Sequence, residues 1–251
     1  MTLTPNDPPR TRFLGVDYDP LEMDAVVSRL LERPAEAPFA ALVTPNSAHV
    51  VRLAEGDPAI ARAYSQAWLC VNDSRVVHFL AKSRRVELPA TPGADLVIEL
   101  LGDPRFDRSS PVLLVGGDTE TFDALVTKAC LTAARHFEAP MRLLSDRLAF
   151  DQTVAFVESN PSRYVFLAVG SPQQELLAED LRRRGEATGV GLCIGAGVEF
   201  LTGRRKRAPA WLSRIGMEWL FRLASEPRRL WRRYLVDSPR ILRLYLKEFT
   251  R

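Results

Sequence analysis

The chain has 251 residues, of which 46% are apolar and 26% charged, with a formal net charge of +3. This composition is typical of a soluble globular protein, and three cysteines are too few and too scattered for a disulfide framework. No run reaches the ~18 apolar residues that a membrane span needs, the first residues lack the apolar core of a signal peptide, and three histidines without a nearby cysteine do not favour a zinc site. Cys70 and Cys193 lie in apolar runs, so we expect buried free thiols, as in a reducing cytoplasm.

The charge is unevenly distributed along the chain. Residues 204–251 hold 14 Lys and Arg against 4 Asp and Glu, a balance of +10, whereas the rest holds 20 against 27, a balance of −7. An acidic body with a basic tail indicates that the tail meets something anionic. We therefore expect a core over residues 1–203 and a basic helical appendage over residues 204–251.

Short apolar runs closed by turn residues follow one another along the core. Residues 1–20 are rich in proline and are expected to be a loose lead-in. The predicted strands are FAALVTPN (39–46), WLCVND (68–73), PVLLVGGD (111–118), MRLLSD (141–146), YVFLAVGSP (164–172) and VGLCIGAG (190–197). Helices are predicted between them, among them residues 74–83 and 121–137. Continuous apolar strands that alternate with helices predict an α/β fold with a mostly parallel sheet covered on both faces.

Ligands of such sheets bind beyond the carboxyl ends of the strands. This rule singles out the residues that follow each run, and we expect them to share one rim: Thr44, Asn46, Asp73, residues 116–118, residues 170–175 and residues 195–199. The stretch GSPQQE (170–175) holds three long polar side chains that a turn does not need. They must reach solvent, cap a helix or meet a ligand.

Several of these rim residues have two interpretations. The turns VGGDTE (115–120) and IGAG (194–197) could hold a phosphate on exposed backbone amides, or they could be close strand–helix turns. Neither matches GxGxxG, and the chain has no P-loop motif. Asp73 could be the N-cap of the helix over 74–83 or a general base at a strand end.

The same ambiguity holds for Thr44 and Asn46, since asparagine after proline is common in turns and caps. The three histidines, His49, His78 and His136, are expected to be structural or surface residues. His136 is placed in the late turn of the helix over 121–137, where a cation is favourable.

From about residue 207 the strand pattern stops, and Pro209, Pro227 and Pro239 punctuate three predicted helical segments. Their apolar faces, with three of the four tryptophans, are interleaved with arginine. Such helices could lie on an anionic membrane surface, form a packed subdomain whose arginines bind phosphate groups, or present a solvated charged face. Nucleic-acid binding is less favoured because no recognition motif appears. An apolar tail face could also mediate a homo-oligomer or contact a membrane-embedded partner.

An ordered set of motifs carries a family resemblance. The motifs are TPNSAHVVRL (44–53), NDSRVVHFLAKSR (72–84), LPATPGADLV (88–97), VLLVGGDTE (112–120), GSPQQE (170–175), IGAGVEFLTGRRKRAPAW (194–211) and GMEWLFRLASEPRRLWRRYL (216–235). From about residue 12 to 240 the chain resembles the WecG/TagA/CpsF family of bacterial glycosyltransferases. PxQE followed by RAPxW and EWxxRLxxEPxR is the most specific part of this resemblance.

The resemblance implies an activity and a fold. The implied reaction is an inverting, metal-independent transfer of a hexose-type sugar from a UDP-sugar to a polyprenyl-diphosphate-linked saccharide, in the synthesis of surface polysaccharides such as exopolysaccharide. The implied architecture is a Rossmann-like core with a membrane-targeting C-terminal appendage, at the cytoplasmic face of the cell membrane, with no cofactor. A non-catalytic nucleotide-binding or scaffold protein of the same fold is the alternative.

The resemblance also implies roles for individual residues. Asp73 matches the proposed catalytic base, although Ser74 stands where the family usually has glycine and would crowd the loop. Thr44 and Asn46 match a TxN motif that would orient the acceptor or the sugar, and Gln174 and Glu175 match a PxQE turn on the donor side. The remaining implied substrate contacts, to phosphate groups, uridine or ribose, are Glu199, Arg207, Arg222, Arg228, Arg229 and Arg232. Gly116 and Gly117 are candidate phosphate contacts because of their glycine-rich turn.

Overall fold

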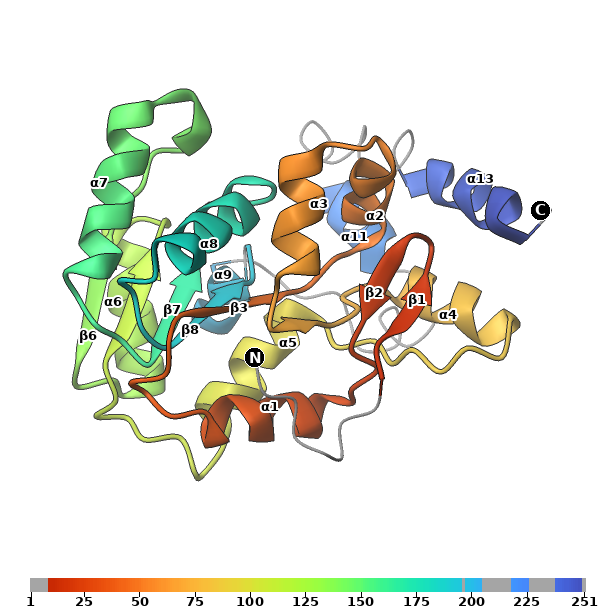
Figure 1. Cartoon of the computed structure of the whole chain (residues 1–251). Coiled ribbons are helices and arrows are strands. Elements are labelled where there is room, and N and C mark those ends of the chain that lie inside the picture. The colour runs from red at the N-terminus through yellow and green to blue at the C-terminus, as the bar shows by residue number, and fades with distance from the viewer. Residues whose placement is uncertain (1–8, 196, 205–217, 226–237, 250–251) are drawn as a thin grey trace.

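The computed structural model describes residues 9–195, 197–204, 218–225 and 238–249, and it is built around a six-stranded sheet (Figure 1). All its strands are parallel, in the order β4-β3-β8-β7-β5-β6. Their bounds are β3 Ala40–Val43, β4 Leu69–Cys70, β5 Val112–Val115, β6 Ala134–Phe137, β7 Tyr164–Leu167 and β8 Val190–Cys193. The predicted α/β class with a parallel, Rossmann-like sheet is confirmed.

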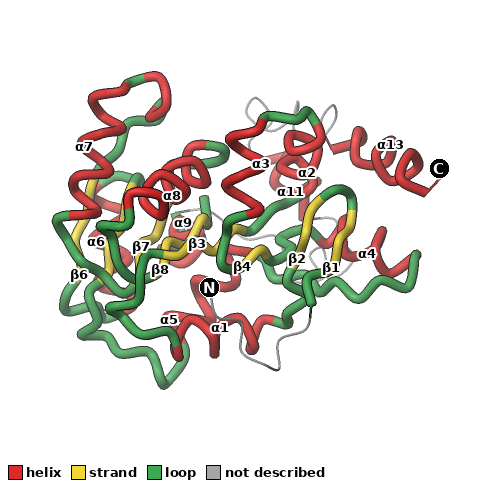
Figure 2. Tube along the Cα trace, viewed as in Figure 1, coloured by secondary structure: helices red, strands yellow, loops and turns green. Residues whose placement is uncertain are grey.

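Helices cover both faces of this sheet (Figure 2). Alternate strand residues face opposite layers, as the two-residue period of a strand requires: Leu42 packs in one apolar cluster and Val43 in the other. One layer holds α2 (Ser47–Ala54), α3 (Pro58–Ser65), α4 (Arg75–Ser83), α7 (Arg147–Glu158) and α8 (Gln173–Arg184). The other holds α1 (Met23–Glu32), α5 (Gly93–Gly102), α6 (Thr119–Ala129) and α9 (Gly197–Thr202). Cys70 and Cys193 are buried free thiols, as predicted.

The segment between β5 and β7 differs from the prediction. The predicted helix over 121–137 is too long, because α6 ends at Ala129 and Cys130 closes it in the left-handed conformation, with φ 53°. Glycine usually takes this place, so the sequence carried no stop signal. The chain then forms the edge strand β6, whose residues are only partly buried and lack a continuous apolar run. The predicted strand over 141–146 is wrong, since Leu143–Ser145 form the short 3₁₀ helix η1.

His136 accordingly lies in β6 and not in a helical turn. Its Nε2 is 3.1 Å from the carbonyl oxygen of Gly116 in the neighbouring strand loop, and its ring stacks on Phe122 of α6 at a centroid distance of 5.0 Å. The prediction of a structural histidine is confirmed, but at a sheet edge and not at a helix end.

The loose lead-in predicted for residues 1–20 is also wrong where the structure describes it. Thr11–Phe13 (β1) and Val16–Tyr18 (β2) pair as an antiparallel hairpin. The chain after β2 is anchored to the sheet, because Oδ2 of Asp19 accepts a 2.7 Å hydrogen bond from the backbone amide of Cys70. Arg10 pairs with Asp19 at 3.2 Å and donates to the carbonyl oxygen of Ala67.

Two tail helices are described, α11 (Glu218–Ser225) and α13 (Ser238–Phe249), and the last packs against α2. Ile241 of α13 is 1% exposed and belongs to the core cluster. The hydroxyl of Tyr245 lies 2.7 Å from Ser83 Oγ and accepts a 2.7 Å hydrogen bond from Arg84 Nε at the end of α4. The division after residue 203 stays a prediction, and any test of the tail must respect this packing.

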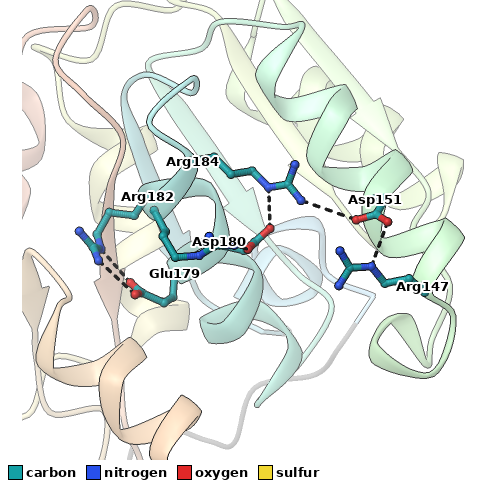
Figure 3. A network of polar contacts seen from close by, with 7 residues as sticks. Arg147, Asp151, Glu179, Asp180, Arg182 and Arg184 are labelled. Carbon is teal, nitrogen blue, oxygen red and sulfur yellow. Dashed lines mark hydrogen bonds and ion pairs between the residues drawn. The ribbon is translucent and has the colours of Figure 1, made fainter.

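Ion pairs tie α7 to α8 on the outside of the molecule (Figure 3). Arg184 donates to Asp180 at 2.7 Å and reaches Asp151 of α7 at 3.6 Å, and Asp151 also pairs with Arg147 at 2.9 Å. Exposed pairs of this kind contribute about 0–1 kcal/mol each. They lie on the C-terminal half of α8, so the N-terminal half of that helix is left to the rim of the sheet.

Candidate active site

Asp73 lies in the loop between β4 and α4, and the start of α5 fixes its carboxylate. Its Oδ1 accepts a 2.8 Å hydrogen bond from the backbone amide of Gly93, the first residue of α5. A Cβ atom on Gly93 would lie only 2.9 Å from the hydroxyl oxygen of Thr44, so the loop after β3 meets the same glycine. The structure therefore brings Asp73 and Thr44 together at the carboxyl edge of the sheet, as predicted.

Ser74, and not Asp73, caps α4, so the N-cap prediction for Asp73 is wrong. The Ser74 hydroxyl accepts from the backbone amide of Val77 at 3.2 Å and lies 2.8 Å from the hydroxyl of Ser47 at the start of α2. With a φ of −108°, position 74 has no need of glycine, and its buried side chain turns toward the two helix starts. The Asp73 carboxylate thus does not serve as the cap of α4.

The side chains of the TxN motif, Thr44 and Asn46, are held by the end of β8 and the start of α2. Oδ1 of Asn46 accepts from the backbone amides of Ala48 and His49, at 3.1 and 3.4 Å, and so caps α2. The Thr44 hydroxyl donates to the carbonyl oxygen of Cys193, the last residue of β8, at 3.1 Å. Both side chains therefore have fixed orientations at the rim.

Gln174 and Glu175 turn into the protein, with exposed fractions of 2% and 1%. Oε1 of Gln174 accepts a 2.9 Å hydrogen bond from the backbone amide of Gly195, and its Nε2 donates to Oε1 of Glu175 at 3.0 Å. Burial raises the pKa of the Glu175 carboxyl, and the hydrogen bond from Gln174 opposes that rise. The polar turn after β7 thus fixes the glycine turn after β8, while its contact with a donor stays a prediction.

Sequence reasoning missed Tyr64 and set His49 aside as structural. The Tyr64 hydroxyl donates to Oε1 of Glu175 at 3.2 Å and lies 3.2 Å from Nδ1 of His49, whose Nε2 is 3.3 Å from Nδ2 of Asn46. Burial raises the pKa of Tyr64 well above its ordinary value. The position of His49, three residues after Asn46 on the same helix, was the one available signal, because nothing local distinguishes Tyr64 from a core residue.

The glycine turn after β5 is tightly packed. Gly116 and Gly117 have φ values of 90° and 71°, and a Cβ atom on Gly116 would lie 3.0 Å from the backbone of Ala168. Asp118 caps α6 through a 2.9 Å hydrogen bond from the amide of Thr121. The hydrogen bond from the Thr121 hydroxyl is the main reason why the pKa of Asp118 is lowered.

Arg204, at the end of the core, donates to the Asp118 carboxylate and lies 3.0 Å from Glu120. The carboxylate of Asp118 therefore lies at the start of α6, where the sequence suggested a bound phosphate as one interpretation. Whether Gly116 and Gly117 contact a substrate stays a prediction.

Comparison with known proteins places the chain in a family. Residues 11–251 match the glycosyl transferase WecG/TagA/CpsF family. The chain belongs to this family. It is 30% identical over 160 residues to the N-acetylglucosaminyldiphosphoundecaprenol N-acetyl-beta-D-mannosaminyltransferase of Bacillus subtilis (strain 168). That alignment covers 62% of this chain and 59% of the relative, so the chain spans about three fifths of the relative's length.

The other residues that the WecG/TagA/CpsF resemblance implies are only partly described. Glu199 lies in α9, half-buried, and Arg222 lies in α11. Arg207, Arg228, Arg229 and Arg232 lie outside the described residues. Within the described ranges, no three His, Cys, Asp or Glu side chains gather as a metal site. In the same ranges no helix is both long and apolar enough to cross a membrane.

Proposed function

We propose that this family member moves a hexose-type sugar from a UDP-sugar to a polyprenyl-diphosphate-linked saccharide, with inversion and without a metal, in surface polysaccharide synthesis. The observation that carries the proposal is the Asp73 carboxylate, held by the amide of Gly93 beside the Thr44 hydroxyl. The activity for which the Bacillus relative is named supports the acceptor class, because that protein transfers a sugar to a diphosphoundecaprenol-linked one.

The reaction needs one base at the acceptor hydroxyl. In the proposed step the acceptor oxygen attacks the anomeric carbon from the face opposite UDP, Asp73 takes the hydroxyl proton, and the bond from the anomeric carbon to the diphosphate oxygen breaks. Attack from the opposite face inverts the configuration at that carbon. Thr44 and Asn46 orient the acceptor or the sugar next to the base. A positioned carboxylate of this kind contributes about 10²–10⁴-fold to such a step.

The donor is proposed to lie along the same rim, toward β8 and β7. Three strand spacings separate β4 from β7, a distance of about 14 Å, so the base lies at one end of the edge and the donor loops lie nearer its middle. Gln174 and Glu175 shape the donor end. Negative charge grows on the leaving UDP, and guanidinium groups can offset it in place of a metal ion. The residues proposed for these donor contacts are Gly116, Gly117, Glu199, Arg207, Arg222, Arg228, Arg229 and Arg232.

The chain is further proposed to work at the cytoplasmic face of the membrane as a peripheral protein. Leu242 and Leu246 of α13 and Phe79 of α4 are exposed to about half of their area, at 51%, 57% and 50%. Arg243 and Lys247 are exposed on the same helix. Apolar side chains combined with basic ones suit an anionic lipid surface, where each basic residue contributes about 1 kcal/mol.

A transfer assay tests the proposal. The chain is incubated with a panel of radiolabelled UDP-sugars and a synthetic lipid-diphosphate-linked N-acetylglucosamine acceptor, with and without EDTA. We expect transfer from one donor, unchanged by EDTA, and a product whose NMR coupling shows the inverted anomer. Binding of UDP without transfer from any donor would instead favour a nucleotide-binding protein of the same fold.

A further inference from the structure

A chain of hydrogen bonds crosses the rim, and backbone amides fix its direction at one end. The amides of Ala48 and His49 donate to Oδ1 of Asn46, at 3.1 and 3.4 Å, so the Asn46 side chain cannot be turned over. Its Nδ2 therefore faces Nε2 of His49, at 3.3 Å. Because an amide nitrogen only donates, Nε2 of His49 accepts and carries no proton.

The proton of a neutral imidazole then lies on the other ring nitrogen. Nδ1 of His49 is 3.2 Å from the hydroxyl oxygen of Tyr64, so the ring donates to Tyr64. The tyrosine proton is consequently directed away from His49 and toward Glu175, whose Oε1 lies 3.2 Å away.

Backbone geometry fixes the other end in the same way. The amide of Gly195 donates to Oε1 of Gln174 at 2.9 Å, so Nε2 of Gln174 faces Oε1 of Glu175, at 3.0 Å. This oxygen thus accepts from both Gln174 and Tyr64. Followed from either end, the hydrogen bonds of this network run toward Oε1 of Glu175, whose side chain is almost completely buried. The two hydrogen bonds to Oε1 fix this carboxylate, whereas its buried Oε2 has no hydrogen-bond partner among the described residues.

We propose that Tyr64 and His49 are positioning residues for sugar transfer. Their relay from Asn46 to Glu175 holds the acceptor-side loop after β3 in a fixed relation to the donor-side loops after β7 and β8. The inference rests on the proposed function, because it assigns these loops to acceptor and donor.

A second contact supports the relay. Nη1 of Arg52, on α2, donates to the hydroxyl of Ser171 in the β7 loop at 3.0 Å. Helix α2 therefore reaches the loop after β7 directly, and through Tyr64 of α3 it reaches Glu175 in the first turn of α8. Strands β3 and β7 are not neighbours, since β8 lies between them. Side chains of α2 and α3 therefore connect the two regions in addition to the contacts that Thr44 and Gln174 make at the end of β8.

The first test is the tautomer of each histidine, read from ¹⁵N chemical shifts of a ¹⁵N-histidine-labelled protein. His49 should carry its proton on Nδ1. The other two histidines provide internal references: Nδ1 of His78 faces the carbonyl oxygen of Leu88 at 2.8 Å, and Nε2 of His136 faces that of Gly116 at 3.1 Å. A proton on Nε2 of His49 would overturn the relay.

The second test is Tyr64→Phe, which removes only the hydroxyl. Its matched control is Tyr164→Phe, because Tyr164 is also buried and donates to a carbonyl oxygen, that of Leu30 at 3.4 Å, away from the rim. In Tyr64→Phe we expect the His49 proton to stay on Nδ1, because Asn46 still donates to Nε2, while the Nδ1 signal shifts because its acceptor is lost. We also expect kcat to fall about ten- to a hundredfold, as small misplacements of reacting groups do, with the donor KM within about twofold. The control should change neither, and an unchanged kcat in Tyr64→Phe would contradict the proposal.

A double-variant cycle separates positioning from general destabilisation. His49→Leu should lower kcat by the same factor as Tyr64→Phe, and the double variant should be no slower than either, since residues of one network are not additive. Losses that multiply would overturn the relay, and His49→Leu serves alone if Tyr64→Phe does not fold. If the wild-type chain transfers no sugar from any donor, the proposed function fails and takes the positioning role with it, while the histidine tautomers still report whether the relay exists.

Discussion

Replacing Gly93 by alanine would place a methyl carbon 2.9 Å from the hydroxyl oxygen of Thr44, and 3.5 and 3.6 Å from the other two atoms of that side chain. Gly93 is the first residue of α5, and its backbone has no positive φ, so alanine fits the main chain there. The conflict is confined to Thr44. Because favourable contacts between heavy atoms begin near 3.5 Å, the hydroxyl must move by about half an ångström.

The cost follows from the bonds that such a movement disturbs. A β-branched side chain has few other rotamers, so Thr44 gives up its hydrogen bond to Cys193, which is worth about 1 kcal/mol. Overpacking adds about 1–3 kcal/mol, and the higher helix propensity of alanine returns at most about 1 kcal/mol. We expect the free energy of unfolding to fall by about 1–3 kcal/mol. The displaced Thr44 side chain no longer orients a substrate beside the Asp73 carboxylate, so kcat should fall about a hundredfold.

Gly102→Ala, at the other end of the same helix, is the control, because a Cβ atom there has nothing within 4 Å. Urea unfolding gives the stability of both variants, and the transfer assay gives their kcat values. Gly102→Ala should match the wild type or be slightly more stable, with full activity. If Gly93→Ala behaves like Gly102→Ala in both measurements, the crowding of Thr44 and Asp73 around one glycine is not what fixes the base.

Three further outcomes follow. Burial raises the pKa of Glu175 above its ordinary value of 4.5. The native state therefore keeps a proton that the unfolded state releases. As the pH rises from about 4.5 through the raised native pKa, this group lowers the free energy of unfolding. In urea melts the free energy of unfolding of Glu175→Gln relative to the wild type should therefore increase over that range, and a flat difference would refute the assignment. Ser74→Ala should cost about 1 kcal/mol of unfolding free energy through the lost cap, while Ser74→Gly should cost a few tenths and keep its transfer rate; a slower Ser74→Gly would show that the serine shapes the acceptor pocket. Leu242→Asp should fold normally yet sediment less with anionic liposomes, and undiminished sedimentation would argue against α13 as a lipid contact.

The tail should be tested with such point substitutions and not by truncation. Removing the chain from residue 204 onward would take Ile241 out of the core, where its side chain is almost fully buried. It would also remove Tyr245 from its contacts with Ser83 and Arg84. A truncated protein could lose membrane binding simply because it no longer folds.

The sheet and its rim were predictable because both follow from local patterns. Strands buried on both faces give continuous apolar runs, and the polar residues after such runs converge at one edge. Thr44, Asn46 and Asp73 were found in this way. The same logic failed at β6, because an edge strand such as Ala134–Phe137 needs no continuous apolar run, and at Cys130, where a cysteine took the left-handed cap.

The connections across the rim were beyond sequence reasoning. Tyr64 and Glu175 are 111 positions apart, and their hydrogen bond depends on how α3 and α8 pack. Gly93 looked like one member of a motif, yet its amide holds Asp73 from 20 residues away. Local patterns show which residues lie at an edge, whereas the packing of helices decides which of them touch.

Asp73→Asn tests the central claim most directly, because asparagine can keep an oxygen for the amide of Gly93 but cannot accept the acceptor proton. Its control is Asp57→Asn, since Asp57 also accepts a backbone amide at a helix start, from Ala59 at 2.8 Å. We predict that Asp73→Asn lowers kcat at least a hundredfold with UDP affinity unchanged, while Asp57→Asn stays active. Transfer at the wild-type rate by Asp73→Asn would contradict the account.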